Sequence, residues 1–244
     1  MKVLGWFRSV FALVYGLASL FVVCLLILFF VFCCRRPPAK LRFISRRWGQ
    51  LLALCAGVKV TVERSGKLYN DGSYIFAANH QSQFDIPVLA GFLEEDFCWM
   101  AKQELFQIPL FGRAMLATGF IPVDRSHGRQ AMLSLIEAAK RIEAGASVII
   151  FPEGTRSKDG QLQDFKSGAM VLAIKAGVPL VPVAVVGTHK ILPKGKLLIQ
   201  PGEVLVRVGE PIDTRPYGTK QKQELAERLK GEVEALMAGA HAKA

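Results

Sequence analysis

The key segment is YIFAANHQSQFD, residues Tyr74–Asp85, in which a short hydrophobic run leads into a polar turn and then a helical pattern. The run Tyr74–Ala78 has the length and the apolar character of a buried strand. The turn contains His80, and Asp85 follows five positions later. A strand that passes through a turn into a helix is the building unit of α/β proteins, so this segment favours an α/β fold.

The same alternation continues along most of the chain. Strand-like runs are expected at 74–78, 97–101, 119–123, 147–151, 180–186, 196–200 and 204–208. Helical patterns are expected at 86–94, 128–143, 165–176 and 219–238. This order predicts an α/β domain with a mixed, partly parallel sheet flanked by helices. No internal repeat or long low-complexity linker interrupts it, so we expect one catalytic domain.

His80 and Asp85 are candidates for a general base and the carboxylate that orients it. An imidazole accepts a hydroxyl proton near neutral pH, and a carboxylate on its other nitrogen fixes the tautomer. Five positions on one helix lie roughly 140° apart, so the two side chains can meet only if a helix begins near Ser82, after His80. The same residues also fit a simpler interpretation, in which Ser82-x-x-Asp85 caps a helix and His80 completes a turn.

No nucleophile of the protein's own accompanies this pair. The sequence has no Gly-x-Ser-x-Gly motif and no cysteine in a catalytic context. The simplest chemistry is therefore activation of a hydroxyl group that belongs to the substrate, which indicates a transferase rather than a hydrolase.

The N-terminal region is apolar and positively charged. Residues 1–59 contain nine of the 31 Lys and Arg residues and none of the 20 Asp and Glu residues, so the rest of the chain has an excess of only two positive charges. Between Arg8 and Arg35 there is no charge, and 10–32 is almost wholly hydrophobic. A helix of roughly 20 residues crosses a hydrocarbon core of about 30 Å, so this segment predicts a transmembrane helix, or one that enters a single leaflet and returns. A cleaved signal peptide fits less well, because bulky residues and two arginines follow the apolar run.

A second, amphipathic helix is expected to begin near Lys40, after Pro37-Pro38. Its apolar residues recur at spacings of three and four: Leu41, Ile44, Trp48, Leu51, Leu52 and Cys55. Arg42, Arg46 and Arg47 fall largely on the other face, which favours an interfacial helix over an ordinary domain helix. We therefore divide the chain into a membrane-anchoring segment, 1–58, and a domain, 59–244. Basic residues are more numerous after the apolar run than before it, which puts the domain on the cytoplasmic side.

Charge and composition disfavour several other classes of protein. The net charge of +11 belongs to the N-terminal region, and the nearly neutral domain argues against nucleic acid as a partner. The five cysteines have no metal-ligand spacing and are interpreted as small hydrophobic residues in a reducing compartment. His127, His189 and His241 are interpreted as surface or loop residues, which leaves too few ligands for a metallohydrolase.

A second candidate site is Phe151–Ser157, Phe-Pro-Glu-Gly-Thr-Arg-Ser, which follows the apolar run 148–150. Arginine binds a phosphate group through two charge-assisted hydrogen bonds, and glycine lets the backbone approach the oxygens. Glu153 cannot bind phosphate itself, but it could orient Arg156 or accept a hydrogen bond from a substrate hydroxyl. The alternative is a surface turn with a Glu–Arg pair.

Further basic residues follow other predicted strands. Lys102 comes after the run 97–101, and Arg125 after 119–123. Ligands of α/β sheets bind where the carboxyl ends of strands converge, so these cations are expected around one pocket with His80 and the Phe151–Ser157 loop. Each is also compatible with a solvated charge at a strand end. The basic turn Lys194-Gly195-Lys196 fits a solvated turn better than a contact with a donor or a lipid headgroup.

The order of these motifs resembles that of the 1-acyl-sn-glycerol-3-phosphate acyltransferases of the glycerolipid acyltransferase superfamily. Asn79–Asp85 matches their Asn-His-x4-Asp motif, and Phe151–Ser157 matches their Phe-Pro-Glu-Gly-Thr-Arg-Ser motif in full. Gly119–Arg125 resembles Gly-x-Ile-x-Ile-Asp-Arg, with Pro122 as a departure that concerns strand pairing. Val178–Val183 is similar to the fourth motif, Val-Pro-hydrophobic-hydrophobic-Pro-Val. The resemblance covers most of residues 40–215.

The resemblance implies an enzyme of phospholipid biosynthesis. His80, oriented by Asp85, would deprotonate the sn-2 hydroxyl of lysophosphatidate, which attacks the thioester of acyl-CoA or acyl-carrier protein and gives phosphatidate. It implies no metal or redox cofactor, and membrane lipids as partners. The residues that it assigns to substrate binding are Lys102, Arg125, Glu153, Gly154, Thr155 and Arg156. Two alternatives stay open, namely a different acceptor, such as glycerol 3-phosphate or another lysophospholipid, and a membrane-binding protein without catalytic activity.

Overall fold

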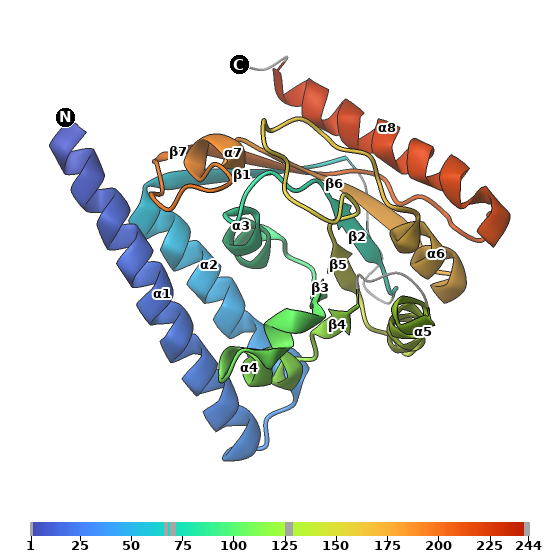
Figure 1. Cartoon of the computed structure of the whole chain (residues 1–244), viewed down its shortest axis with the longest axis horizontal. Helices are drawn as coiled ribbons and strands as arrows, with labels where there is room; N and C mark the ends of the chain where they lie inside the picture. The colour runs from blue at the N-terminus through green and yellow to red at the C-terminus, as the bar shows by residue number, and fades with distance from the viewer. Residues whose placement is uncertain (1, 66–67, 69–71, 125–128, 242–244) are drawn as a thin grey trace.

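The computed structural model describes residues 2–65, 68, 72–124 and 129–241, and it has three layers (Figure 1). A central sheet lies between two groups of helices, each of which covers one of its hydrophobic faces. The first group contains α1 (Lys2–Phe32), α2 (Arg42–Ala56) and α3 (Asp85–Phe92). The second group contains α5 (Arg129–Glu143), α6 (Ser167–Ala176) and α8 (Lys222–His241). The predicted mixed α/β sheet flanked by helices is confirmed.

The sheet has seven strands in the order β1-β7-β6-β2-β5-β3-β4. They are β1 (Val58–Arg64), β2 (Ile75–Ala78), β3 (Cys98–Lys102), β4 (Ile121–Val123), β5 (Val148–Ile150), β6 (Leu180–Val186) and β7 (Gly202–Val208). Only the β6–β7 pair is antiparallel. Strands β2 to β6 therefore all end at one edge of the sheet, which brings the residues after them together.

The central strand β2 shows how the sequence forms both cores. All four of its residues are buried. Phe76 and Ala78 point to the face covered by α1, α2 and α3, while Ile75 and Ala77 point to the face covered by α5, α6 and α8. A strand buried on both faces reads as a continuous apolar run, which is why it was recognisable in the sequence.

Short elements complete the chain between the strands. They are the 3-10 helices η1 (Pro38–Leu41), η2 (Gln103–Gln107) and η3 (Thr219–Gln221), and the α-helices α4 (Phe111–Ala117) and α7 (Thr188–Ile191). Helix α4 packs on α1 through the cluster that contains Cys24, Ile27 and Ala114. The β3–β4 connection therefore touches the N-terminal helix.

One predicted strand is absent, and one strand was missed. Residues 196–200 form no strand, because this segment leaves the turn in which Lys196 N–H bonds Pro193 C=O and has no neighbouring strand to pair with. Ile199 is nevertheless buried, which explains its apolar pattern. Conversely, β1 was missed, although Val58, Val60 and Val62 alternate with polar residues as they do in a half-buried strand.

Strand β4 is shorter than the predicted 119–123, because Phe120 N–H still bonds Met115 C=O at the end of α4. Pro122 lies within β4 and opposite Ala101 of β3. Because β4 is the last strand of the sheet, proline removes no hydrogen bond to a further strand. The departure from the family motif at this position is therefore compatible with strand pairing.

Helix α2 was expected to turn its apolar face to lipid and its arginines to headgroups, and the structure differs in part. Ile44 and Leu52 are buried against the protein, in packing on α1 and α3. Arg42 and Arg46 point toward the connection between α3 and β3, where Arg42 pairs with Asp96 and Arg46 donates to the Glu94 carbonyl. Leu51 and Arg47 are exposed as expected, and Phe43 and Leu54 are further exposed apolar residues of this helix.

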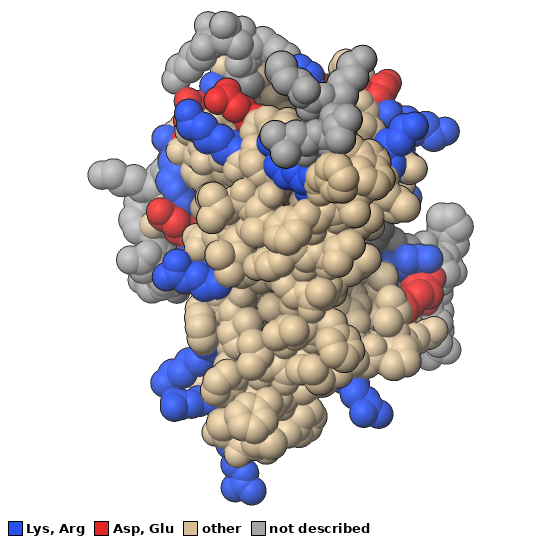
Figure 2. All heavy atoms as spheres, turned by 90° about the vertical axis from the view of Figure 1, so that its left-hand side faces the viewer, with Lys and Arg blue, Asp and Glu red and all other residues tan. Residues whose placement is uncertain are grey.

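Helix α1 is long and apolar enough to cross a membrane, by length and composition. It lies beside α2 along one side of the molecule (Figure 1). Its outward side exposes large apolar residues: Trp6, Phe7, Phe11, Val14, Leu17, Phe21, Val22, Leu25, Leu26, Phe29 and Phe32. Figure 2 shows this side as a broad uncharged surface with Lys and Arg side chains along its margins.

Candidate active site

His80 and Asp85 meet at the end of β2. The Nδ1 atom of His80 lies 2.7 Å from Oδ2 of Asp85. Helix α3 begins at Asp85 itself rather than near Ser82, so the turn after His80 is three residues longer than expected from the sequence. The predicted contact between the two side chains is nevertheless present, because His80 lies before the helix and Asp85 in its first turn.

The carboxylate of Asp85 fixes the tautomer of His80. Its Oδ2 also accepts hydrogen bonds from the backbone N–H groups of Gln81 (2.8 Å) and Ser82 (2.9 Å). A carboxylate oxygen accepts rather than donates, so Nδ1 of His80 carries the proton and Nε2 has the free lone pair. The Asp85 side chain is fully buried, whereas 13% of the His80 side chain is exposed. The imidazole can therefore reach a substrate, and the carboxylate cannot.

The ring of His80 is held from its flat side by Phe151, the first residue after β5. The two rings are stacked with their centroids 3.9 Å apart and their planes 10° from parallel. Trp99 of β3 contacts Phe151 in turn, with its ring centroid 5.8 Å from that of Phe151. The imidazole orientation is thus determined by packing as well as by the hydrogen bond to Asp85.

The side chain of Glu153 joins the 151–157 loop to the 79–85 motif by hydrogen bonds. Its Oε1 accepts a hydrogen bond from His80 N–H at 2.6 Å, and its Oε2 accepts from the N–H and the side-chain amide of Gln163. Ser157 N–H also donates to His80 C=O at 2.8 Å. Glu153 is almost fully buried, and this burial raises the pKa of its carboxyl group. Its oxygens accept hydrogen bonds from His80 and Gln163. They do not orient Arg156, which was one of the roles that the sequence suggested.

The predicted cations differ in their surroundings. Arg156 is half-buried in the loop after β5, and within the described part of the chain its guanidinium has no hydrogen bond or ion pair. Lys102 ends β3, is exposed, and pairs with Glu104 at 2.7 Å. Arg125 lies outside the described residues, and so does His127.

Gly154 has a φ of +73°, which favours glycine, and Thr155 is exposed. His80, Asp85 and the 153–157 loop are therefore in direct contact, and Lys102 is the last residue of β3, the strand next to β5.

Comparisons with known proteins agree with this geometry. A model of the family described as Acyltransferase matches residues 59–186. The chain is 30% identical to a 1-acyl-sn-glycerol-3-phosphate acyltransferase of Escherichia coli K12, over 95% of this chain and 92% of that protein. It is 35% identical to the chloroplastic LPAT1 of Arabidopsis thaliana, named as the same kind of acyltransferase, over 83% of this chain. The chain belongs to the acyltransferase family.

A solved structure extends this acyltransferase relationship to the whole fold. The 1-acyl-sn-glycerophosphate acyltransferase PlsC of Thermotoga maritima superposes with a TM-score of 0.77 at 29% sequence identity, over 96% of this chain and 98% of that one. The present chain spans about 58–61% of the length of its plastid relatives from Arabidopsis thaliana and Brassica napus.

Several residues that hold the acyltransferase site together were not singled out from the sequence. The side chain of Asn79 accepts from Val185 N–H at 2.6 Å and donates to Val185 C=O at 2.9 Å, which anchors the first motif to β6. Ser82 Oγ donates to Leu192 C=O at 2.7 Å. Asn79 and Ser82 were visible only as parts of a motif, because their partners lie more than 100 positions later.

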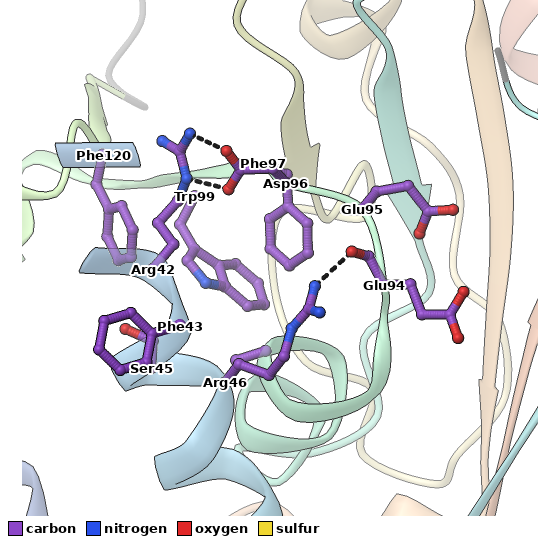
Figure 3. A pocket seen from close by; sticks show the side chains of 11 residues that line it. Arg42, Phe43, Ser45, Arg46, Glu94, Glu95, Asp96, Phe97, Trp99 and Phe120 are labelled. Carbon is purple, nitrogen blue, oxygen red and sulfur yellow. Dashed lines mark hydrogen bonds and ion pairs between the residues drawn. The ribbon is translucent and has the colours of Figure 1, made fainter. Parts of the chain in front are cut away.

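A cavity of about 280 Å³ lies on the α2 side of the acyltransferase sheet (Figure 3). Its apolar lining comes from Phe43, Phe97, Trp99 and Phe120, and charged side chains of the α3–β3 connection and of α2 stand at its rim. It adjoins the starts of β3 and β4, whereas His80 follows the end of β2. Trp99 lines this cavity and also contacts Phe151, the residue that stacks on His80.

Proposed function

We propose that this acyltransferase transfers an acyl chain from a thioester to the sn-2 hydroxyl of 1-acyl-glycerol 3-phosphate and so produces phosphatidate. The observation that carries the proposal is the contact between His80 and Asp85, which leaves Nε2 of His80 free to accept a proton. The names of the Escherichia coli, Arabidopsis thaliana and Thermotoga maritima relatives support the same acceptor.

In the proposed reaction, Nε2 of His80 takes the proton of the acceptor hydroxyl while its oxygen attacks the thioester carbonyl. Asp85 stabilises the imidazolium that forms. When the tetrahedral intermediate collapses, the carbon–sulfur bond breaks and the departing thiolate receives the proton from His80. No group of the protein is acylated, which agrees with the lack of a protein nucleophile next to His80 in the sequence.

The phosphate of the acceptor requires positive charge near His80. Arg156 lies between Glu153 and Ser157, which both bond the backbone of His80, so the backbone of Arg156 is close to the base. We assign Arg156, the backbone near Gly154, Thr155, Lys102 and Arg125 to this role. Glu153 acts by holding the two motifs together, since its oxygens already accept hydrogen bonds from the protein. A thioester of coenzyme A or of acyl-carrier protein serves as donor, and no cofactor is required.

Residues 1–58 anchor the enzyme to a membrane in this proposal, with the domain on the cytoplasmic side. The outward side of α1 is apolar, and the exposed residues Phe43, Leu51 and Leu54 of α2 add to it. Leu105, Ile108 and Leu116 are further exposed apolar residues on the β3–β4 connection, next to α1. Together they form a surface larger than is usual for a soluble monomer. The acceptor is a lipid, so an anchored enzyme meets it at the membrane surface.

Helix α1 enters one leaflet in this proposal rather than crossing the bilayer. Its inner side packs on the protein from Ala12 to Ile27, which is about 22 Å of helix at 1.5 Å per residue. Ser19, midway along this stretch, accepts a hydrogen bond from Trp48 of α2. A helix that crossed the bilayer would carry α2 and the polar domain edge beside it into the hydrocarbon core, which is unfavourable for charged groups.

The test is acyl transfer by purified enzyme in lipid vesicles, with acyl-CoA as donor and either lysophosphatidate or glycerol 3-phosphate as acceptor. We expect phosphatidate from lysophosphatidate and no transfer with His80→Ala. Binding of lysophosphatidate should be retained in this variant, since His80 acts on the hydroxyl and not on the phosphate. Transfer to glycerol 3-phosphate instead would identify the other acceptor, and full activity of His80→Ala would exclude the proposed base.

A further inference from the structure

The side chain of Lys194 reaches across to the loop after β5. Its Nζ atom donates to Arg156 C=O at 2.6 Å and lies 3.4 Å from Thr155 Oγ1. Lys194 is half-buried and belongs to the connection between α7 and β7, some 38 positions after Arg156. An ammonium group has three donors, so at least one N–H remains for another ligand after these contacts.

Lys166 lies against the same loop at Gly154. A Cβ atom added to Gly154 would be 2.9 Å from Cε and 3.0 Å from Nζ of Lys166, so the lysine chain passes directly over the glycine. The backbone of Lys166 is fixed at this place, because its N–H donates to Pro152 C=O at 2.9 Å. The ammonium groups of Lys166 and Lys194 therefore adjoin consecutive parts of the segment Gly154–Arg156.

The positive charges at this loop are not neutralised by nearby carboxylates. Among the residues that the structure describes, Lys166, Lys194 and Arg156 have no ion pair. The acids of the segment 151–166 are engaged elsewhere, and one of them, Asp164, pairs with Lys230. Glu153 accepts from the backbone of His80 and from Gln163, and Asp159 accepts from Ser157 Oγ and Gln161 N–H. Three cations near each other without an acid favour binding of an anion.

The connection that carries Lys194 is itself fixed to the first motif. Leu192 C=O accepts the hydroxyl of Ser82, two residues after His80. The ring of His189 in α7 lies against Gly160, since a Cβ there would be 3.2 Å from the ring. His189 is therefore a packed residue rather than the surface residue that the sequence indicated. Lys194 is thus held at a defined distance from both motifs, as a positioning residue must be.

We propose that Lys166 and Lys194 complete, with Arg156, a binding site for a phosphate group of a substrate, and that Lys194 also positions the Thr155–Arg156 backbone. Lys194, which the sequence favoured as part of a solvated turn, is in this view part of the site, whereas Lys196 of the same turn is exposed. The nature of the substrate rests on the proposed function, but phosphate binding itself does not. The phosphate belongs either to the acceptor or to the donor thioester, and the experiment separates these two sources.

The kinetic test compares Lys194→Met, Lys166→Met and the conservative Lys194→Arg in the full-length enzyme in vesicles. Lys196→Met serves as the matched control, because Lys196 lies in the same turn but is exposed. Loss of a hydrogen bond to a charged group changes an equilibrium by about ten- to a hundredfold. We therefore expect KM for the phosphate-bearing substrate to rise at least tenfold in both Met variants, with less than a twofold change in Lys196→Met. Lys194→Arg should restore most of the loss.

The source of the phosphate follows from which KM changes. A rise in KM for lysophosphatidate alone assigns the site to the acceptor, and a rise for acyl-CoA alone assigns it to the donor. An equal fall in kcat for all variants, without a change in either KM, would contradict phosphate binding. So would unchanged kinetics in both Met variants.

Binding of inorganic phosphate provides a second test that does not need turnover. Inorganic phosphate is titrated into each purified protein in a calorimeter. Compared with the wild type, we expect the dissociation constant to be at least tenfold higher in Lys166→Met and Lys194→Met and unchanged in Lys196→Met. This result would support the site even if the acceptor were a different phosphate ester. Equal phosphate affinity in all four proteins, with unchanged thermal unfolding, would overturn the proposal.

Discussion

Asp85 is oriented by more than its contact with His80. Two backbone N–H groups fix the same carboxylate oxygen that bonds the imidazole, so the side chain has one orientation. The histidine in turn is fixed by stacking on Phe151. The proposed base therefore has a defined direction before any substrate arrives, which is the arrangement that lowers the cost of reaching a transition state.

Replacement of Asp85 by Asn should reduce kcat strongly and leave KM for lysophosphatidate nearly unchanged. The amide has the same shape, but it does not stabilise an imidazolium and its NH2 group favours the wrong tautomer of His80. We expect kcat to fall on the order of a thousandfold. Steady-state kinetics would check this, and thermal unfolding would show whether the variant folds. A kcat within tenfold of the wild type would exclude Asp85 as the orienting group.

Glu153 makes stability depend on pH. Burial raises the pKa of its carboxyl group above the ordinary 4.5, so the folded protein holds the proton more tightly than the unfolded chain. The stability that comes from this group is complete below the unfolded pKa, and it falls as pH rises through the folded pKa. The glutamine of Glu153→Gln does not titrate. Between pH 4 and pH 7, the unfolding temperature of the wild type should therefore fall relative to that of the variant. A constant difference would contradict this assignment.

The sequence predicted which residues form the candidate site better than it predicted the hydrogen bonds between them. His80, Asp85 and the 153–157 loop were recognisable because the residues that do chemistry come directly after apolar strands. The roles of Glu153, Asn79 and Lys194 were not predictable, because their hydrogen bonds join segments that lie far apart in the chain. Contacts of this kind depend on strand order, which local patterns do not determine.

At the level of elements, the crossing of α2 and α3 depends on two glycines. A Cβ on Gly49 would be 2.3 Å from Pro87 C=O, and one on Gly91 would be 2.9 Å from Gln50 N. The backbones of the two helices therefore touch. Because α3 begins with Asp85, this crossing connects the N-terminal helix pair directly to the His80–Asp85 pair.

Gly49→Ala should therefore destabilise the protein even though alanine favours helices. Forcing a methyl group into a closely packed contact costs about 1–3 kcal/mol. The matched control is Gly231→Ala in α8, where no atom lies within 4 Å of the added Cβ and a gain of roughly 0.5–1 kcal/mol is expected. Urea unfolding of both variants would measure the difference, and equal stabilities would show that the helices separate without cost.

The elements themselves were predictable where their pattern was strong. Apolar runs located β2, β5 and β6, and periodicity located α5 and α8. The alternating β1 was missed, and α4 and α7 were too short for a periodic signal. The pattern of α2 was read correctly as amphipathic, but Ile44 and Leu52 pack on protein, because apolar periodicity is the same for a helix that faces lipid and for one that packs on protein.

At the level of the whole molecule, the position of α1 predicts the topology of both its ends. If the helix enters one leaflet, the ends lie on the same side of the membrane. Cys33 and Cys34, which are exposed after α1, and a cysteine introduced by Lys2→Cys should then all react with a membrane-impermeant maleimide added to inside-out vesicles. A protein that retains only one of these cysteines serves for each measurement. Labelling of the two ends from opposite sides would show that α1 crosses the bilayer.

The pairing of β1 with β7 has a consequence for the order of events during synthesis. Val58 pairs with Gly202, 144 positions later in the chain, and β1 follows directly after the two N-terminal helices. While the ribosome is still making the middle of the protein, β1 has no partner, and the apolar helices before it cannot yet pack on a finished domain. Pairings over such long separations form slowly, and exposed apolar segments aggregate meanwhile. If these helices anchor the protein as proposed, they gain most by reaching the lipid first, and we expect insertion to precede folding of the domain.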